Sequence, residues 1–308
     1  MANSAKQPMF GKVALIGLGL IGSSLSLAMR RGGLAGFISG YAQSAETRKT
    51  AVDLGLVDEI HTNASEAVKN ADLVVLCVPV GVCGAVTAEI SDNLKQGAIL
   101  TDVASTKGSV VRDMVPHVPA GVHFIPGHPI AGSEKSGPKA GYAELFDNRG
   151  CILTPDENAD PVMTDKLEAF WRACGSYVDR MDAAHHDMVL AITSHLPHLI
   201  AYSIVMTASH LEEVTESEVI KFSAGGFRDF TRIAASDPTM WRDVFLNNKE
   251  AVLEMLGRFS EDLSALQKAI RHQDGDMLFD LFTRSRDIRR GIVEAGQDTD
   301  EPDFGRLS

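Results

Sequence analysis

The chain has 308 residues, 44% of them hydrophobic, and carries a formal net charge of -12. A chain of this length can bury a large core and exceeds one typical domain, so we expect two domains. The acidic balance disfavours nucleic acid and anionic membrane as partners, because both require a basic surface, but a few local cations could still bind an anionic substrate.

The N-terminal segment "MANSAKQPMF" lacks the apolar core of a signal peptide, and no uninterrupted run approaches the roughly 20 apolar residues of a membrane span. The four cysteines are scattered without a Cys-x-x-Cys pair: Cys77, Cys83, Cys151 and Cys174. This usage favours reduced thiols, most of them small core residues, over disulfides or zinc ligands. We therefore expect a soluble, cytoplasmic protein.

Residues 12–103 alternate short apolar runs typical of strands, such as "KVALIGLG" and "ADLVVLCVPV", with segments typical of helices. Near-continuous apolar strands that alternate with helices indicate a parallel sheet covered on both faces. Three later runs, "HFIPG", "GCILTP" and "SYVDRMD", could extend the sheet, with a helix at "PVMTDKLEAFWRACG". The sequence predicts a doubly wound α/β domain over residues 1–182.

From about Asp182 to about Ala295 the pattern changes to long helical periodicities with no convincing strand, which predicts an all-helical second domain over residues 183–308. One apolar stripe in it has alternating spacings of four and three: Val252, Leu256, Phe259, Leu263, Leu266 and Ile270. Such a stripe is typical of a helix seam. Packing within the domain and a subunit interface are both consistent with it.

The run "ALIGLGLIGSSL" places Gly17, Gly19 and Gly22 as Gly-x-Gly-x-x-Gly between a strand and a helix. The first glycine permits the tight turn, the second lets the backbone approach a pyrophosphate, and the third lets the helix pack on the strand. With Leu20 and Ile21 opening the helix, the phosphates would lie at its positive N-terminus. We predict a Rossmann-type dinucleotide site.

The second strand ends without the acid that commonly binds the adenosine ribose. Ala42, Gln43 and Ser44 stand there, and Arg48 is the nearest cation, so both NAD and NADP are open as cofactors. After the fourth strand, "CVPVGV" places Val78 and Pro79 either along the cofactor cleft or in an ordinary turn.

Ligands of open α/β sheets bind beyond the carboxyl ends of the strands, where "DVASTK" and "PGHPIAG" bring Ser105 and His128 towards one cleft. His128 lies between Gly127 and a proline in what we expect to be a sharp loop. Because the ordinary histidine pKa of about 6.5 suits proton transfer, His128 can accept a hydroxyl proton as a hydride leaves. Ser105 could instead cap the next helix, and Lys107 could simply be solvated.

In the helical domain, His195 and His198 are three residues apart and can share one helix face. A third ligand at matching spacing is lacking and HExxH is absent, so we predict no metal site. Substrate contacts near the domain junction or satisfied buried histidines are expected instead. Arg232 could bind a substrate carboxylate or form an ion pair within the domain, and no role is assigned to Arg228.

Five blocks in order, "GLGLIGSSL", "TDVASTK", "GHPIAGSEKSG", "SHLPH" and "GGFRDFTRIAASDPTMWRD", resemble the prephenate/arogenate (cyclohexadienyl) dehydrogenase family over nearly the whole chain. The resemblance implies a Rossmann domain followed by a helical domain that dimerises. It therefore implies a homodimer through the helical domain. It also implies an NAD(P)-dependent enzyme that acts on a small molecule in tyrosine biosynthesis.

The resemblance also implies roles for individual residues. His128 resembles the catalytic histidine that binds the ring hydroxyl of prephenate, Ser105 its partner, and Arg232 the residue that binds the ring carboxylate. The remaining substrate contacts implied by the resemblance are Ser133, Glu134, His195 and His198. Lys135 is left without a role.

The implied reaction transfers a hydride from C4 of the cyclohexadienol to the nicotinamide and releases the ring carboxylate as carbon dioxide. Prephenate would give 4-hydroxyphenylpyruvate and arogenate would give tyrosine, and the sequence leaves both open. A dehydrogenase of the 3-hydroxyacid type, or a nucleotide-sensing protein without turnover, would share the glycine turn, but neither predicts all five blocks.

Overall fold

The computed structural model of the chain describes residues 7–133, 135–215 and 225–294. They divide into two compact units, one up to Val252 and one from Leu253 onward. The predicted division into domains at residues 182 and 183 stays a prediction.

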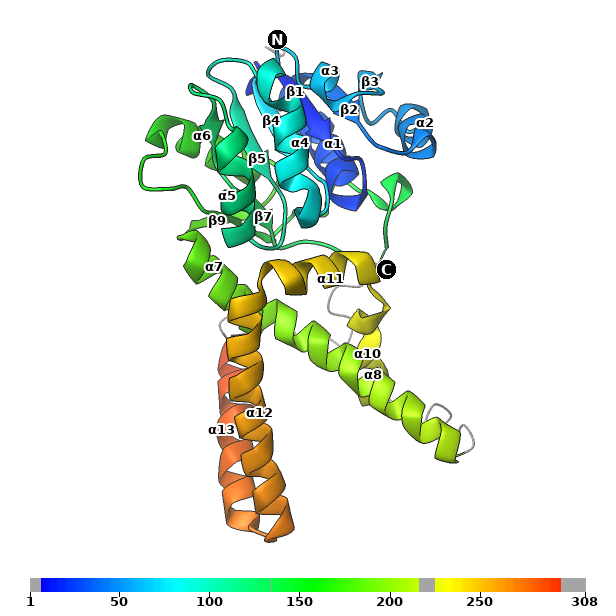
Figure 1. The fold of residues 1–308 in the computed structure, drawn as a ribbon, viewed down its shortest axis with the longest axis vertical. Coiled ribbons are helices and arrows are strands. Elements are labelled where there is room, and N and C mark those ends of the chain that lie inside the picture. The colour runs from blue at the N-terminus through cyan, green and yellow to red at the C-terminus, as the bar shows by residue number, and fades with distance from the viewer. Residues whose placement is uncertain (1–6, 134, 216–224, 295–308) are drawn as a thin grey trace, which may run out of the picture. The chain divides into compact units, whose positions relative to one another are not determined.

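The core of the first unit is a six-stranded parallel sheet of order β3-β2-β1-β4-β5-β6 (Figure 1). Its strands are β1 (Phe10–Ile16), β2 (Ala35–Tyr41), β3 (Glu59–His61), β4 (Leu73–Leu76), β5 (Ile99–Asp102) and β6 (His123–Phe124). This is the strand order of a Rossmann fold, in which the order reverses between β1 and β4 and opens a ligand crevice there. The predicted doubly wound α/β fold is confirmed.

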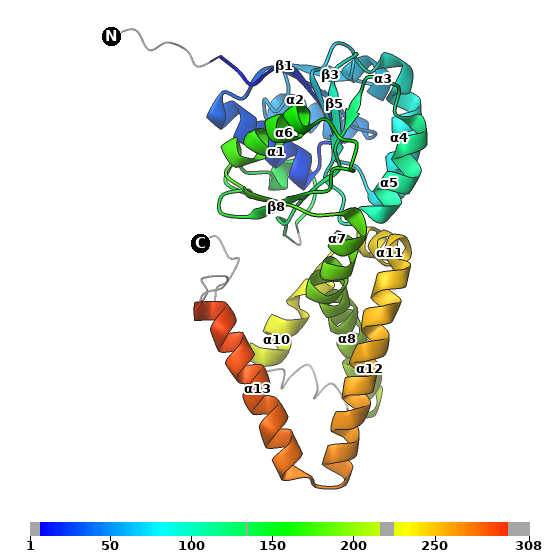
Figure 2. The ribbon, with the colours of Figure 1, turned by 90° about the vertical axis from the view of Figure 1, so that its left-hand side faces the viewer.

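Helices cover both faces of this sheet, as Figure 2 shows for α4 and α5 on one side and α1 and α6 on the other. The helices of this part are α1 (Leu20–Gly32), α2 (Ala45–Asp53), α3 (Ala64–Ala67), α4 (Cys83–Ile90), α5 (Gly108–Met114) and α6 (Pro161–Ala173). Successive residues of β1 point to opposite faces. Val13 and Leu15 therefore join one buried cluster, and Ala14 and Ile16 join the other.

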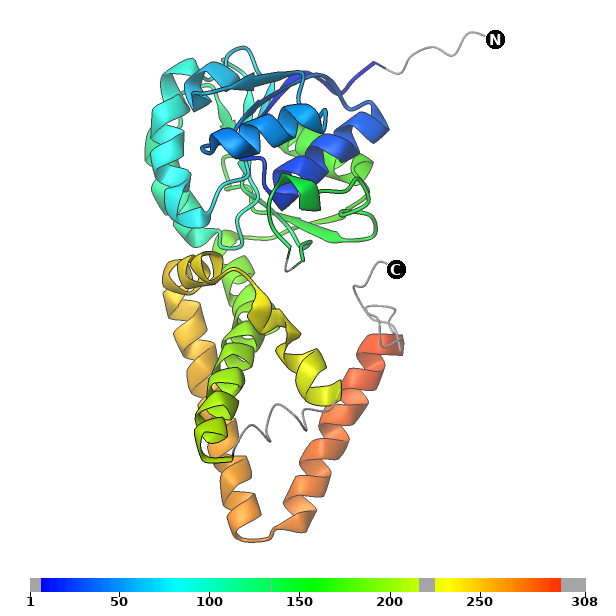
Figure 3. The ribbon, with the colours of Figure 1, turned by 90° about the vertical axis from the view of Figure 1, so that its right-hand side faces the viewer.

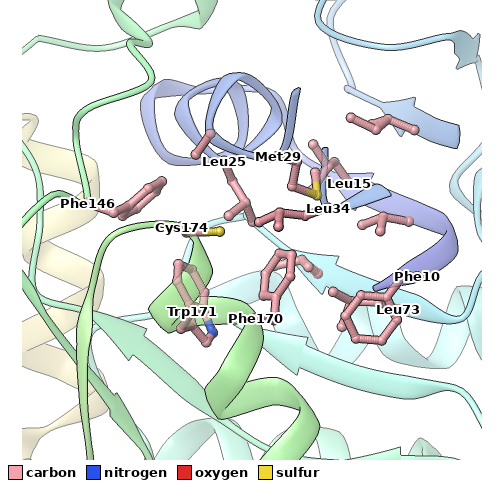
Figure 4. Packing of buried hydrophobic residues seen from close by; sticks show 14 of the residues in the cluster. Phe10, Leu15, Leu25, Met29, Leu34, Leu73, Phe146, Phe170, Trp171 and Cys174 are labelled. Atoms are coloured by element: carbon pink, nitrogen blue, oxygen red, sulfur yellow. The ribbon is translucent and has the colours of Figure 1, made fainter. Parts of the chain in front are cut away.

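The cluster beneath α1 and α6 is rich in aromatic side chains (Figure 4). Phe170 and Trp171 of α6 are fully buried. Phe170 lies edge to face with Phe10 at 5.6 Å between ring centroids, and Trp171 does so with Phe146 at 5.5 Å. All four cysteines are free thiols, and three of them are buried, as expected for core residues.

Three further strands form a separate sheet of order β7-β8-β9: β7 (Gly127–Pro129), β8 (Gly150–Leu153) and β9 (Tyr177–Arg180). Of the three runs considered as extensions of the main sheet, only "HFIPG" contributes to it, through β6. "GCILTP" and "SYVDRMD" form β8 and β9 instead, so the expectation is wrong for these two runs. β7 pairs with β8 in antiparallel fashion and belongs to this second sheet, so the chain leaves the parallel sheet after β6.

From residue 183 onward the described residues are helical, as expected. The elements are α7 (Ala183–Leu190), a π-helical turn (Ala191–His195), α8 (Leu196–Thr215), α10 (Gly225–Thr231), a 3₁₀ turn (Arg232–Ala235), α11 (Pro238–Asn247), α12 (Lys249–Arg271) and α13 (Gly275–Glu294).

The continuous helix Ala183–His210 has a mean hydropathy of 1.5 in its most apolar window, of which 28% is buried. By length and composition alone, it is the one helix among the described residues that could cross a membrane. The sequence analysis had found no apolar run long enough for a membrane span. It also supplies buried histidines to the cluster described below.

In the second unit, α12 and α13 are joined by a short turn and diverge from it (Figure 3). Several large apolar side chains on them are exposed, among them Leu263 (48%), Ile270 (64%), Phe279 (71%) and Phe282 (56%). The predicted stripe on α12 is thus only partly covered by its own unit.

Candidate active site

The glycine turn follows β1 and opens α1. Gly17 has a φ of +103°, and a Cβ there would lie 2.3 Å from the carbonyl oxygen of Cys77. A Cβ on Gly22 would lie 2.1 Å from the carbonyl oxygen of Gly17. Both positions therefore require glycine, one for the turn and one for packing of helix on strand.

Gly19 differs from the other two glycines because a Cβ there would meet no atom within 4 Å. It is the N-cap residue of α1, where no side chain caps the helix within the described chain, and Leu20 and Ile21 form the first turn. The space before the helix N-terminus is therefore open, and the backbone N–H groups of this turn are suited to bind phosphate oxygens. The residues present fit a dinucleotide pyrophosphate.

The end of β2 carries no carboxylate. Ala42 is buried, whereas Gln43 and Ser44 are exposed, and the Ser44 hydroxyl accepts a hydrogen bond from the N–H of Thr47 at the start of α2. The guanidinium of Arg48 donates to the carbonyl oxygens of Ala42 and Gln43 at 2.7 and 2.8 Å. A cation is thus held at the strand end at which the adenosine ribose binds in Rossmann folds.

Val78 and Pro79 follow β4, the neighbour of β1. The Val78 side chain approaches to 3.2 Å of a Cβ built on Gly17, and Pro79 is exposed. Val78 therefore borders the glycine turn itself.

His128 lies in the middle of β7, where it pairs with Ile152 of β8. The expectation of a sharp loop is therefore wrong: the chain at this point is a short strand of the second sheet, and the His128 side chain is only 7% exposed. The N–H of Gly127 donates to Asp102 Oδ1 at 3.2 Å, and its carbonyl oxygen accepts from Lys107 Nζ at 2.6 Å. Both backbone polar groups of Gly127, the residue before His128, are thereby held.

The two residues that hold Gly127 form an ion pair, Lys107 with Asp102, in which both side chains are fully buried. Asp102 also accepts the N–H of Ala104 at 2.9 Å. Lys107 is therefore not solvated, one of the alternatives that its sequence position left open. The pair ties β7 to the end of β5.

The His128 side chain begins a chain of hydrogen-bonding groups. Its Nδ1 lies 2.9 Å from Nε2 of His186, and Nδ1 of His186 lies 2.8 Å from Oδ1 of Asp187. The two imidazoles meet edge to face, with 5.1 Å between ring centroids. His186 and Asp187 both belong to α7. Its N-cap residue is Asp182, whose side chain accepts the N–H of His185.

Asp187 also caps α5, because its two carboxylate oxygens accept the N–H groups of Lys107 at 2.7 Å and Gly108 at 2.8 Å. The alternative that Ser105 caps this helix is therefore wrong. Ser105 is half-buried in the loop before α5, and its backbone faces the ring of His195.

Burial lowers the pKa of His128 well below its ordinary value, and the charges of His186, Lys107 and His195 act in the same direction. Burial also lowers the pKa of His186, although Asp187 partly opposes this. For Asp187, burial alone would raise the pKa, but the hydrogen bonds from His186 and from the backbone lower it overall. Near neutral pH the site thus holds two neutral imidazoles and one carboxylate.

His195 is the last residue of the π-helical turn, an irregularity that is frequent at functional sites. The Asn248 amide lies 3.1 Å from its Nδ1 and also donates to the carbonyl oxygen of Asp187 at 2.8 Å. Burial lowers the pKa of His195 to about 4. His195 is therefore neutral and connected through Asn248 to the His128 cluster.

His198 stacks on Trp241, with 3.6 Å between ring centroids and an angle of 23°, and the His195 ring lies 6.1 Å from the same indole. The two histidines therefore share one helix face, as predicted. Burial lowers the pKa of His198, and the charge of the exposed Arg232 lowers it further, so Arg232 lies within electrostatic reach of His198. Among the described residues, no group of three or more His, Cys, Asp or Glu side chains is arranged to hold a metal ion.

Not every predicted site residue joins this cluster. Ser133 is exposed, and its hydroxyl accepts the N–H of Lys135 at 3.2 Å within its own loop. Glu134 lies outside the described residues. Arg228 is exposed on α10.

The sequence did not point to the three residues that connect His128 to His195: His186, Asp187 and Asn248. The segment "HHD" was visible after the N-cap Asp182, but neighbouring helix residues do not normally face each other, so the contact between His186 and Asp187 has no sequence signature. Nothing in the sequence near Asn248 distinguishes it from a helix-flanking polar residue.

Comparison with known proteins gives consistent matches along the chain. The model of the prephenate dehydrogenase nucleotide-binding domain matches residues 25–179, and that of the prephenate dehydrogenase dimerization domain matches residues 182–284. The chain is 41% identical over 283 residues to a cyclohexadienyl dehydrogenase of Zymomonas mobilis. The match covers 92% of this chain and 96% of the relative.

Two solved structures extend the comparison. Prephenate dehydrogenase from A. aeolicus, in complex with hydroxyphenyl propionate and NAD+, superposes with a TM-score of 0.86 at 35% identity and covers 92% of this chain and 98% of that one. Synechocystis arogenate dehydrogenase gives a TM-score of 0.77 at 27% identity and covers 91% and 99%. The predicted family, its dehydrogenase activity and its nicotinamide dinucleotide cofactor are confirmed, and the chain belongs to the prephenate dehydrogenase family.

Proposed function

We propose that this protein catalyses the oxidative decarboxylation of prephenate, arogenate or both, with NAD or NADP as hydride acceptor. The observation that carries the proposal is the buried, neutral His128, whose ring is hydrogen-bonded to His186. His186 connects it through Asp187 and Asn248 to His195. The family membership and the relatives named for these two substrates support it.

The cofactor would bind at the glycine turn, with the pyrophosphate at Gly19 and the first turn of α1, and with Val78 and Pro79 bordering the site. When bound, the nicotinamide supplies the acceptor for the hydride from C4 of the cyclohexadienol ring. At the end of β2, Ala42, Gln43 and Ser44 present no carboxylate to repel a 2′-phosphate, so these residues are compatible with both cofactors.

The proton of the ring hydroxyl passes to Nε2 of His128 as the hydride leaves C4, so the carbon–oxygen bond becomes a carbonyl. The bond from the ring to its carboxylate then breaks, carbon dioxide leaves, and the electron pair enters the ring, which becomes aromatic. His128 returns its proton to the oxygen, which has become a phenolate. The histidine therefore ends each cycle in its starting state, as general acid–base catalysis requires.

The other residues would bind the substrate. Arg232 would hold the ring carboxylate through its planar guanidinium until carbon dioxide leaves. Ser105 would share the ring hydroxyl with His128, and its backbone already faces His195. The further contacts that we propose are His195, His198, Ser133 and Glu134, of which Ser133 and Glu134 rest on the family resemblance alone.

The decisive experiment is a four-way assay of prephenate and arogenate with NAD and NADP, followed by absorbance of the reduced cofactor. We expect turnover in at least one combination, and His128→Asn should bind cofactor normally but lose turnover by roughly 10²- to 10⁴-fold. No turnover in any combination would reject the proposed function, whereas oxidation of a 3-hydroxyacid instead would favour the other dehydrogenase class.

We also propose that the protein is a cytoplasmic homodimer that associates through its helical part. The free thiols fit a reducing compartment. The exposed Phe279 and Phe282 on α13 fit an interface better than a solvent-facing surface.

Light scattering after size exclusion should give the mass of a dimer, and Phe279→Glu with Phe282→Glu should give a monomer. Arg284→Glu, on another face of α13, is the matched control, and a wild-type monomer would refute the proposal.

A further inference from the structure

We infer that His186 and Asp187 are positioning residues that hold His128 in the tautomer with the proton on Nδ1 and the lone pair on Nε2. This inference rests on the proposed function, because it is Nε2 that then receives the proton of the substrate hydroxyl. Neither residue touches the substrate in this account. They act through His128.

The direction of each hydrogen bond follows from the carboxylate at the end of the chain. An ionised carboxylate only accepts, so Nδ1 of His186, 2.8 Å from Asp187 Oδ1, must carry the proton. Neutral His186 then has its lone pair on Nε2 and can only accept there. The contact of 2.9 Å therefore requires that Nδ1 of His128 donates. The lone pair of His128 is left on Nε2.

The charges that face this chain come from several elements. Lys107, from the start of α5, and His195, from the π-helical turn, act on His128, while Lys107 and Asp102 of β5 act on His186. Lys107 is already neutralised by Asp102, and His195 is neutral, so Asp187 is the carboxylate that directs the two imidazoles. The Asp187 carboxylate is itself ionised and fixed by two backbone N–H groups.

The arrangement has a catalytic consequence. When Nε2 of His128 takes the hydroxyl proton, the ring becomes a cation whose Nδ1–H already points at a lone pair of His186. The hydrogen bond from a charged donor is stronger than the neutral one, so the partner stabilises the imidazolium as it forms. Asp187, two groups away, supplies the opposing charge. This is the logic of a catalytic triad, with a second imidazole inserted before the carboxylate.

The first test needs no turnover, and its main readout is made on the wild-type protein. The ¹⁵N chemical shifts of the histidine rings in the wild-type protein at neutral pH report which nitrogen carries the proton, and single His→Asn variants assign the signals. We expect His128 as the Nδ1–H tautomer and His186 likewise. A wild-type His128 with its proton on Nε2 would overturn the inference, even if the enzyme turned over prephenate or arogenate.

The second test separates orientation of His128 from general support of the fold. His186→Ala removes the acceptor, and we expect kcat to fall by roughly 10²- to 10⁴-fold with cofactor affinity unchanged. His186→Gln offers a carbonyl oxygen to His128 Nδ1. Because one hydrogen bond is regained, its kcat should be about tenfold higher than that of His186→Ala.

The matched control is His185→Ala, an exposed histidine next to His186 on the same helix, which should retain wild-type kcat. Activity of His186→Ala close to wild type would overturn the inference, and so would a His186→Gln variant no better than His186→Ala. Absence of activity in the wild-type enzyme would instead reject the proposed function, while the tautomer measurement would still decide the inference.

Discussion

Lys107 and Asp102 form an ion pair in which neither side chain has any solvent exposure, and the same lysine ammonium donates to the carbonyl oxygen of Gly127. The strand that carries His128 is thus joined to the main sheet by buried charge. Removing one partner of such a pair leaves the other charge buried without compensation.

We expect Lys107→Met to lower the free energy of unfolding by about 3 to 5 kcal/mol. The double variant Asp102→Asn with Lys107→Met should lose less than Lys107→Met alone, because it leaves no unpaired charge in the core. Urea unfolding followed by circular dichroism measures both. Equal stability of the wild type and Lys107→Met would contradict this account of the pair.

His195 should make the protein less stable in mild acid. Its pKa is about 4 in the folded state because the ring is buried, against about 6.5 in an unfolded chain. Below about pH 6.5 the unfolded state therefore binds a proton at this residue that the folded state does not bind. The free energy of unfolding then falls until about pH 4, by up to roughly 3 kcal/mol from this residue. His128 and His186, whose pKa values are also lowered, act in the same direction.

The variant His195→Gln should lose less stability between about pH 7.5 and about pH 5 than the wild type, because one of the titrating groups is gone. Unfolding free energies at the two pH values give the comparison. His185→Gln, at an exposed position, should behave like the wild type. The same loss in wild type and His195→Gln would show that His195 is not the titrating group.

Arg232→Ala should weaken substrate binding and leave cofactor binding intact, because the guanidinium is proposed to hold only the ring carboxylate. The expected rise in KM is roughly 10- to 100-fold, the value of hydrogen bonds to a charged group. Steady-state kinetics in substrate and in cofactor separate the two effects. Arg258→Ala, which removes an exposed arginine paired with Glu254, is the control. An unchanged KM for substrate would refute the assignment.

Ala42→Asp should shift the enzyme towards NAD. A carboxylate at the end of β2 can bind the ribose hydroxyls of NAD and repels the 2′-phosphate of NADP. We expect the ratio of kcat/KM for NAD over NADP to rise by roughly tenfold or more. Ala42→Asn has nearly the same size without the charge, so it should leave the ratio close to the wild-type value. An equal shift in both variants would mean that size, not charge, sets the preference.

Much of the fold was predictable because it depends on local patterns. Near-continuous apolar strands alternating with helices gave the parallel sheet, and the glycine spacing at Gly17, Gly19 and Gly22 marked the turn after β1. The second sheet was not predictable in the same way. A run such as Gly150–Leu153 shows that a strand forms but not which strand it pairs with, since that depends on which distant segments the folded chain brings side by side.

The candidate site was predictable to a similar degree. His128 and Ser105 follow strands at the edge where Rossmann folds bind ligands, so their position in the chain pointed to them. The groups that orient His128 were not visible, because His186 is 58 residues away and meets it only through the packing of α7. The proline after His128 suggested a loop, yet β7 accommodates it at the end of its three residues.

One carboxylate, that of Asp187, both caps α5 and orients the ring next to His128. A fluctuation that moves Asp187 away from the first turn of α5 also moves it away from His186, and His128 then loses the groups that orient it. Small openings at helix ends require far less free energy than unfolding of the sheet core. The enzyme should consequently lose activity on warming before its sheet unfolds, and regain it on cooling. The contacts of Asp187 with α5 and His186 should be the first to open.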